Sequence, residues 1–145
     1  MPNAAKATAA ILFAGLAYYV SLKIIPIYSA DRVLPYFSLM NAAMGLAIGW
    51  RVCGRLAGRG YGAALGNAVT TAVVLMGVAL FAHSVEEMIS RAFRQQYSGP
   101  VDAVVAVADI MATYASQIAI ADVLIPAAIG SILAALIVEL VAQVT

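Results

Sequence analysis

The chain carries an uninterrupted run without a charged side chain from Tyr61 to Ala82. A helix crosses a bilayer core of about 30 Å with roughly 20 apolar residues, so this run is long enough to span a membrane. The composition agrees, because 64% of the residues are hydrophobic and 10% are charged, whereas roughly a quarter are charged in soluble domains. We therefore expect a single integral-membrane domain over 1–145.

The other apolar runs are separated by polar or proline-containing stretches, and together they predict an all-α fold. We expect a polytopic membrane helical bundle with four transmembrane helices plus one amphipathic helix packed at the outer face. The expected spans cover about 5–25, 36–52, 61–82 with a helical extension to 95, and 122–142. The amphipathic helix is expected over 101–118.

The loop between the second and third spans holds the cysteine and a cluster of arginines: Arg51, Cys53, Arg55 and Arg59. Basic residues clustered in a short loop usually remain on the cytoplasmic side, which places both termini there. Glu139 lies near the inner end of the last span, and we expect it to pair with Arg51 or Arg55. Positive charge beside Cys53 favours the thiolate, so the cysteine is either a reactive thiol or a small interfacial residue.

Two G-x-x-x-G motifs, Gly45 with Gly49 and Gly62 with Gly66, predict close helix packing. They serve either as seams within the chain or as a dimer interface. Interhelical hydrogen bonds are expected from the polar side chains within the spans, namely Asn41, Asn67, Thr70 and Thr71.

A polar hairpin is predicted beyond the third span. Its members are His83, Glu87, Arg91, Arg94, Asp102 and Asp109. Side chains four residues apart share a helix face, so His83 is expected to pair with Glu87, and Glu87 with Arg91.

Asp102, Asp109, Thr113 and Ser116 form one polar stripe on a helical wheel. In a spanning helix Asp109 would be an unpaired acid in lipid, at roughly 3 kcal/mol or more. We therefore expect this helix to fold back with its stripe toward the third span, Arg94 facing Asp102 and Glu87 facing Asp109.

The sequence contains no Ser-His-Asp set, phosphate-binding loop or metalloprotease motif. The single histidine, His83, could join Glu86, Glu87 and Asp109 around a divalent ion, but a salt-bridge network with Arg91 and Arg94 explains the same residues. We expect no catalytic residue, cofactor or metal, and no nucleic-acid partner. The expected partners are membrane lipids and either other membrane proteins or a second copy of the chain.

Four sequence segments carry a resemblance to a known family: the start M-P-x-A-A-K, the loop G-W-R-V-C-G-R-L-A-G-R-G over 49–60, the pair E-M at 87–88, and Y-S-G-P-V-D-A over 97–103. On these segments the whole chain resembles the tellurite-resistance TrgA family of small inner-membrane proteins from alphaproteobacteria. The resemblance implies a bacterial inner-membrane location and a role in tellurite tolerance. It implies no reaction that can be assigned to residues.

Three hypotheses for the function follow. The first is a non-enzymatic structural or accessory subunit that docks membrane protein partners, such as a respiratory or photosynthetic complex. The second is an oxyanion permease or exporter, in which Arg51, Arg55 and Arg59 gather anions at the inner mouth. The third is thiol chemistry at Cys53. Transport by a monomer is disfavoured because the middles of the expected spans carry no ionisable group.

Overall fold

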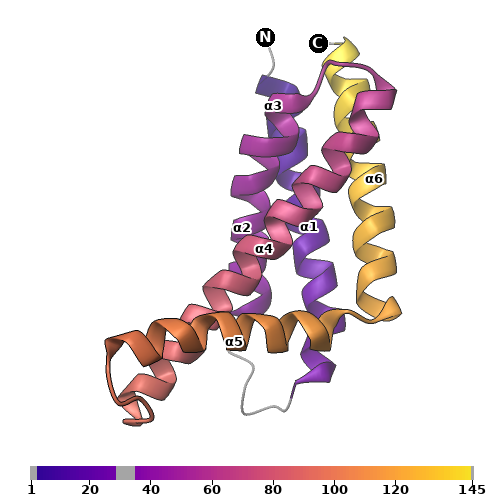
Figure 1. Cartoon of the computed structure of the whole chain (residues 1–145). Coiled ribbons are helices and arrows are strands. Elements are labelled where there is room, and N and C mark those ends of the chain that lie inside the picture. Colours follow the sequence, from indigo (N-terminus) through magenta and orange to yellow (C-terminus); the bar gives the residue numbers. More distant parts are fainter. Residues whose placement is uncertain (1–2, 29–34, 145) are drawn as a thin grey trace.

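The computed structural model describes residues 3–28 and 35–144, and its elements are helical (Figure 1). The described ranges contain no β-strand, so the all-α fold class is confirmed. In chain order the elements are α1 (Asn3–Ile24), η1 (Ile25–Ile27), α2 (Phe37–Ile48), η3 (Gly49–Cys53), α3 (Gly54–Leu56), α4 (Tyr61–Phe93), α5 (Pro100–Ile118) and α6 (Ala121–Val144).

The helices α1, α2 and α6 run along the long axis of the bundle, α4 leans across them, and α5 crosses one end (Figure 1). Helix α1 begins and α6 ends at the opposite end of the bundle from α5. Following the orientation that the arginine loop predicts, we name the end where α1 begins the inner end, and the end with α5 the outer end.

Four stretches of the described chain are long and apolar enough to cross a membrane: Ala4–Ile27, Tyr61–Phe93, Pro100–Ile118 and Ala121–Val144. Many large apolar side chains point outward from them, including Ile11, Val73 and Ile129. Such a surface is stable in lipid and unfavourable in water. The chain is a multi-pass membrane protein.

The region over 36–52, predicted to be the second span, is not one continuous helix in the structure. Its helix is divided into α2, the π-helical turn η3 and the short α3, so no single regular helix there reaches the length of a span. In the π turn the backbone N–H of Gly54 bonds to the carbonyl of Gly49, five residues back. The extra residue keeps Gly54 on the side that faces α1, where an added Cβ would lie 2.7 Å from the Lys6 Cα.

The α1–α2 contact is a glycine seam, as the first G-x-x-x-G motif predicts. A Cβ at Gly45 would collide with the carbonyl oxygen of Phe13, and one at Gly49 with that of Ala9. Only glycine lets the two backbones lie this close. The motif is therefore used within the chain. By contrast, Cβ atoms at Gly62 and Gly66 would meet nothing within 4 Å, so the second motif packs against no described part of the chain.

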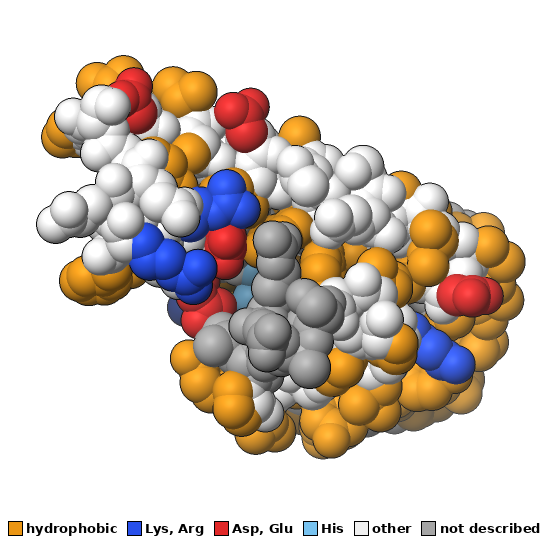
Figure 2. Space-filling model, turned by 90° about the horizontal axis from the view of Figure 1, so that it is seen from below, with side chains coloured by type: hydrophobic (Ala, Val, Ile, Leu, Met, Phe, Trp, Pro, Cys, Tyr) orange, Lys and Arg blue, Asp and Glu red, His pale blue; other side chains and the backbone are white. Residues whose placement is uncertain are grey.

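Helix α5 has its polar stripe on the opposite side from the one we predicted. Asp102, Asp109, Thr113 and Ser116 are exposed, whereas Ile110 and Ile118 are buried. The apolar side chains pack on the bundle because their burial is more favourable than that of the carboxylates, which retain their hydration at the surface. Figure 2 shows exposed acidic side chains on this outer face.

A third side of α5 is both exposed and apolar, with Val101, Val104 and Val105. A helix with one hydrated polar side, one side packed on the bundle and one exposed apolar side is typical of the boundary between lipid and water. Although α5 has the length and hydropathy of a span, it lies across the end of the bundle (Figure 1). This arrangement agrees with the predicted amphipathic helix at the outer face.

Candidate functional site

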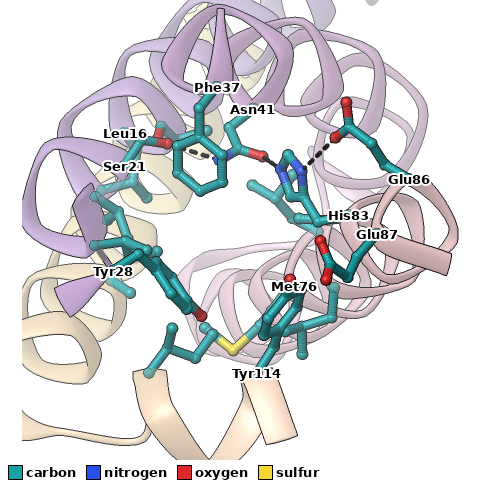
Figure 3. Close-up of a pocket in the computed structure, with 18 of the residues that line it drawn as sticks. Leu16, Ser21, Tyr28, Phe37, Asn41, Met76, His83, Glu86, Glu87 and Tyr114 are labelled. Atoms are coloured by element: carbon teal, nitrogen blue, oxygen red, sulfur yellow. Dashed lines mark hydrogen bonds and ion pairs between the residues drawn. The ribbon is translucent and has the colours of Figure 1, made fainter. Parts of the chain in front are cut away.

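A cavity of about 500 Å³ lies in the outer half of the bundle (Figure 3). No residue before Phe13 in α1 or before Ala72 in α4 lines it. Its apolar lining is Phe13, Leu16, Ala17, Val20, Ile24, Phe37, Ala72, Leu75, Met76, Ala79, Leu80, Ile118 and Ala127, and its polar lining is Ser21, Tyr28, Asn41, His83, Glu86, Glu87, Ser90, Arg94 and Tyr114. We call this space the outer cavity.

A chain of polar contacts joins three helices along one wall of the outer cavity. The Ser21 hydroxyl donates to the carbonyl of Ala17 over 2.7 Å, and Asn41 Nδ2 donates to Ser21 Oγ over 2.8 Å. Asn41 Oδ1 lies 2.9 Å from His83 Nε2, and His83 Nδ1 lies 3.5 Å from Glu86 Oε2. Figure 3 shows these side chains in one row. The contacts fix α1, α2 and α4 relative to one another at this depth.

The direction of these hydrogen bonds determines the tautomer of the neutral imidazole. Because the Ser21 proton is donated to Ala17, Ser21 Oγ accepts from the Asn41 amide, which leaves Asn41 Oδ1 toward the ring. A carbonyl oxygen only accepts, so the proton of the neutral ring is on Nε2. Nδ1 is then an acceptor that faces the Glu86 carboxylate.

Aromatic rings surround the polar end of the cavity. The Phe37 ring lies 4.5 Å from the His83 ring, centroid to centroid, and Tyr28 meets Tyr114 edge to face at 5.5 Å. Burial, and secondarily the nearby Tyr114, raises the pKa of Tyr28 to about 12. The Tyr28 phenol therefore remains a neutral hydroxyl at physiological pH.

The charged residues of the predicted polar hairpin are paired differently from our expectation. Glu87 accepts a hydrogen bond from Arg91 Nε over 2.8 Å, as predicted. His83, however, faces Glu86 instead of Glu87, because Asn41 holds the ring on the other side. Arg94 donates to Ser90 Oγ over 3.2 Å and lines the rim of the cavity.

The predicted register between α4 and α5 is also wrong. Asp109 shares a small hollow of about 160 Å³ with Arg91 instead of facing Glu87. Among the described residues, Asp102 and Asp109 form no ion pair within 4 Å. Both carboxylates lie on the exposed stripe of α5, which explains why neither pairs with a basic side chain of α4. The part of the chain that the structure describes contains no group of three His, Cys, Asp or Glu residues able to hold a metal.

The inner end is organised around a buried carboxylate instead of an arginine pair. Glu139 is 1% exposed and accepts hydrogen bonds from the backbone N–H of Gly58 over 2.8 Å and of Gly60 over 2.6 Å. Both glycines have positive φ, +85° and +95°, which turns their N–H groups toward one point. The predicted pairing of Glu139 with Arg51 or Arg55 is therefore replaced by backbone contacts.

The side chains of the arginine loop point in different directions. Arg51, Arg55 and Arg59 are exposed, and none of them lines the outer cavity. Cys53 is 1% exposed and packs in the core with Ala5, Ala9 and Phe13. An apolar environment disfavours a thiolate, so this position does not favour a reactive thiol.

The interhelical hydrogen bonds predicted from the sequence are only partly present. Asn41 bridges α1 and α4, and Asn67 donates to the carbonyl of Leu56 in α3. Thr70 and Thr71 instead donate to carbonyls four residues back in their own helix. Neither Ser21 nor Tyr28 was expected at a functional site. The available signal was Ser21, a polar side chain within an apolar helix.

Comparison with known proteins adds no relative. No protein-family profile, curated protein or solved structure matches the chain.

Proposed function

We propose that this protein is a non-enzymatic membrane protein that binds a small amphiphilic molecule in the outer cavity. The observation that carries the proposal is the division of the cavity into an apolar part between α1 and α4 and a polar end around His83, Glu86 and Arg94. Its volume of about 500 Å³ falls within the roughly 300–1,000 Å³ of small-molecule sites. An amphiphile fits this division because each of its parts meets groups of its own polarity.

Packing in the inner half supports binding over conduction. Inward of the cavity, Ala5, Ala9, Phe13, Ala68 and Ala134 belong to one buried cluster. The glycine seam brings α1 and α2 into backbone contact at the same depth. A small molecule that enters from the outer end therefore stops at Phe13. A permease in this conformation would need these helices to separate.

We further propose that the protein acts as an accessory subunit and that its link to tellurite tolerance, implied by the family resemblance, is indirect. The apolar outer surface supports contact with lipids and with other membrane proteins. The exposed arginines of the inner loop line neither the outer cavity nor the small hollow beside Asp109. Replacement of the chromosomal gene by a cavity-filling variant is expected to lower tellurite survival as much as gene deletion does.

The cavity-filling variant is Ala72→Phe, since Ala72 lines the outer cavity. Its matched control is Val73→Phe on the same helix, because Val73 is 65% exposed on the lipid-facing side. Native mass spectrometry of protein released from lipid nanodiscs is expected to show an adduct of defined mass on the wild type and on Val73→Phe. The adduct should be absent from Ala72→Phe. An equal adduct on both variants, or none on the wild type, would overturn the proposal.

A further inference from the structure

We propose that the ligand of the outer cavity is a lipophilic organic cation whose ammonium group lies beside both His83 Nδ1 and the Glu86 carboxylate. This inference rests on the proposed function and assigns the chemical class of the amphiphile. It is carried by the hydrogen-bond polarity around His83, by the order of charges along α4, and by the aromatic rings at the polar end.

In a neutral His83 ring, the contact between Nδ1 and the Glu86 carboxylate has no hydrogen. With the ring proton on Nε2, donated to Asn41 Oδ1 at 2.9 Å, His83 Nδ1 is an acceptor. It faces a second acceptor, Glu86 Oε2, at 3.5 Å, and both residues line the cavity. Two acceptors at this distance repel unless a donor lies beside both. An ammonium N–H group is such a donor, and its charge also balances the carboxylate.

The neighbouring carboxylate does not compete for the cation in the same way. Glu87 already accepts a hydrogen bond from Arg91 Nε at 2.8 Å. Glu86 has no arginine or lysine partner within 4 Å among the described residues. Glu86 is therefore the carboxylate with charge available for a ligand.

The order of charges along α4 selects a cation attached directly to an apolar body. Helix α4 runs outward, so Glu86 lies next to the apolar part of the cavity and Arg94 lies at the rim. Figure 2 shows basic and acidic side chains gathered beside the histidine on this face. A phospholipid places its phosphate next to the acyl chains, which would bring an anion against Glu86. An amine attached directly to a hydrocarbon or aromatic body instead places its positive charge against Glu86, which is favourable.

Aromatic rings that line the outer cavity add to this preference. Phe37 stacks beside His83 at 4.5 Å, and Tyr28 and Tyr114 line the same space. The negative face of an aromatic ring attracts an organic cation. An anionic or neutral head group gains no such term.

The test uses three compounds of the same shape and different charge: 4-phenylbutylammonium, 4-phenylbutanol and 4-phenylbutanoate. Tritiated 4-phenylbutylammonium is bound to the purified full-length protein in detergent, and each unlabelled compound is used to displace it. We expect the cation to displace at a concentration at least about tenfold lower than the alcohol, equivalent to about 1.4 kcal/mol. The carboxylate should not displace. Equal potency of cation and alcohol would overturn the inference.

Variants locate the effect. Glu86→Gln should weaken the cation at least about tenfold and leave the alcohol unchanged. Asp109→Asn removes an exposed carboxylate that does not line the outer cavity, so it should change neither. Binding of both compounds should be lost in Ala72→Phe. If no compound binds the wild type, the proposed function fails as well. If cation and alcohol bind equally and Ala72→Phe abolishes both, only the assignment of a cation fails.

A proton on His83 Nδ1 is the competing occupant, and the single histidine of the chain makes it directly measurable. In protein labelled with ¹⁵N-histidine, we expect a ligand-free ring at neutral pH with the proton on Nε2 alone. Addition of 4-phenylbutylammonium should shift the Nδ1 resonance. A ring protonated on both nitrogens before any ligand is added would overturn the inference without any variant.

Discussion

The inner and outer halves of the same three helices are built in contrasting ways. In the inner half, Gly45 and Gly49 bring α2 against the backbone of α1, and alanines fill the core. In the outer half, α1, α2 and α4 line a cavity of about 500 Å³, and polar contacts through Asn41 connect them.

This difference separates stability from binding within one bundle. Close packing of small residues gives many dispersion contacts and leaves no space for a ligand. Around the outer cavity α1, α2 and α4 lack some of these contacts. Hydrogen bonds through Asn41 and His83 fix their positions relative to one another there. The contrast predicts that substitutions in the inner half act on folding and that those in the outer half act mainly on the ligand.

The largest effect is expected at the glycine seam. Gly49→Val would drive a branched side chain into the Ala9 carbonyl, and we expect a loss of at least about 3 kcal/mol in the free energy of unfolding. Gly66→Val is the control, because a Cβ there meets nothing within 4 Å. Size-exclusion chromatography and thermal unfolding in detergent measure both. A monodisperse Gly49→Val protein with wild-type unfolding temperature would refute the difference between the halves.

The next effect is expected at the inner loop. Glu139→Ala leaves the partly buried N–H groups of Gly58 and Gly60 without their carboxylate acceptor, which should cost about 2–3 kcal/mol in unfolding free energy. Arg55→Gln should change the unfolding temperature little, since Arg55 is exposed and Glu139 is held by backbone groups. Equal destabilisation by both variants would instead support the pairing of Glu139 with an arginine.

A smaller effect on stability is expected in the outer half. Asn41→Ala removes the bridge between Ser21 and His83 and should cost about 1–2 kcal/mol. Gln96→Ala, at an exposed amide, should remain within about 0.5 kcal/mol of the wild type. Chemical unfolding followed by circular dichroism gives both values. If Asn41→Ala destabilised the protein as much as Gly49→Val, the outer half would carry stability too.

The smallest effect is expected in the labelling of the cysteine. Cys53 is 1% exposed, so maleimide should leave the native protein almost unmodified and react after unfolding in sodium dodecyl sulfate. Ser98→Cys in a Cys53→Ala background supplies an exposed control thiol that should react at once. Rapid labelling of native Cys53 would instead favour thiol chemistry at the inner surface.

Helix positions followed from the sequence because charges and prolines mark their ends. The predicted helices over 101–118 and 122–142 correspond to α5 (Pro100–Ile118) and α6 (Ala121–Val144). Asp122 and Pro100 stand in the first turns, where both are favoured. The close packing of the first glycine motif was also predicted, whereas the second motif, with the same spacing, packs against no described part of the chain.

The site was less predictable because its contacts join distant positions or involve the backbone. Asn41 and His83 are 42 residues apart, and no local pattern pairs them. Glu139 binds N–H groups, which have no signature in side-chain sequence. The stripe on α5 was identified correctly, but a stripe alone does not tell whether carboxylates turn toward a partner helix or toward water.

The carboxylate of Glu139 also has a bearing on the order in which the chain is completed during synthesis. Gly58 and Glu139 are 81 positions apart in the sequence. The turn between α3 and α4 therefore leaves the ribosome long before Glu139, which accepts the hydrogen bonds of this turn. The α1–α2 hairpin needs only residues already made, whereas this turn waits for the last helix to insert. A nascent chain halted before residue 139 should therefore be cut by protease at the turn, and a released full-length chain should resist.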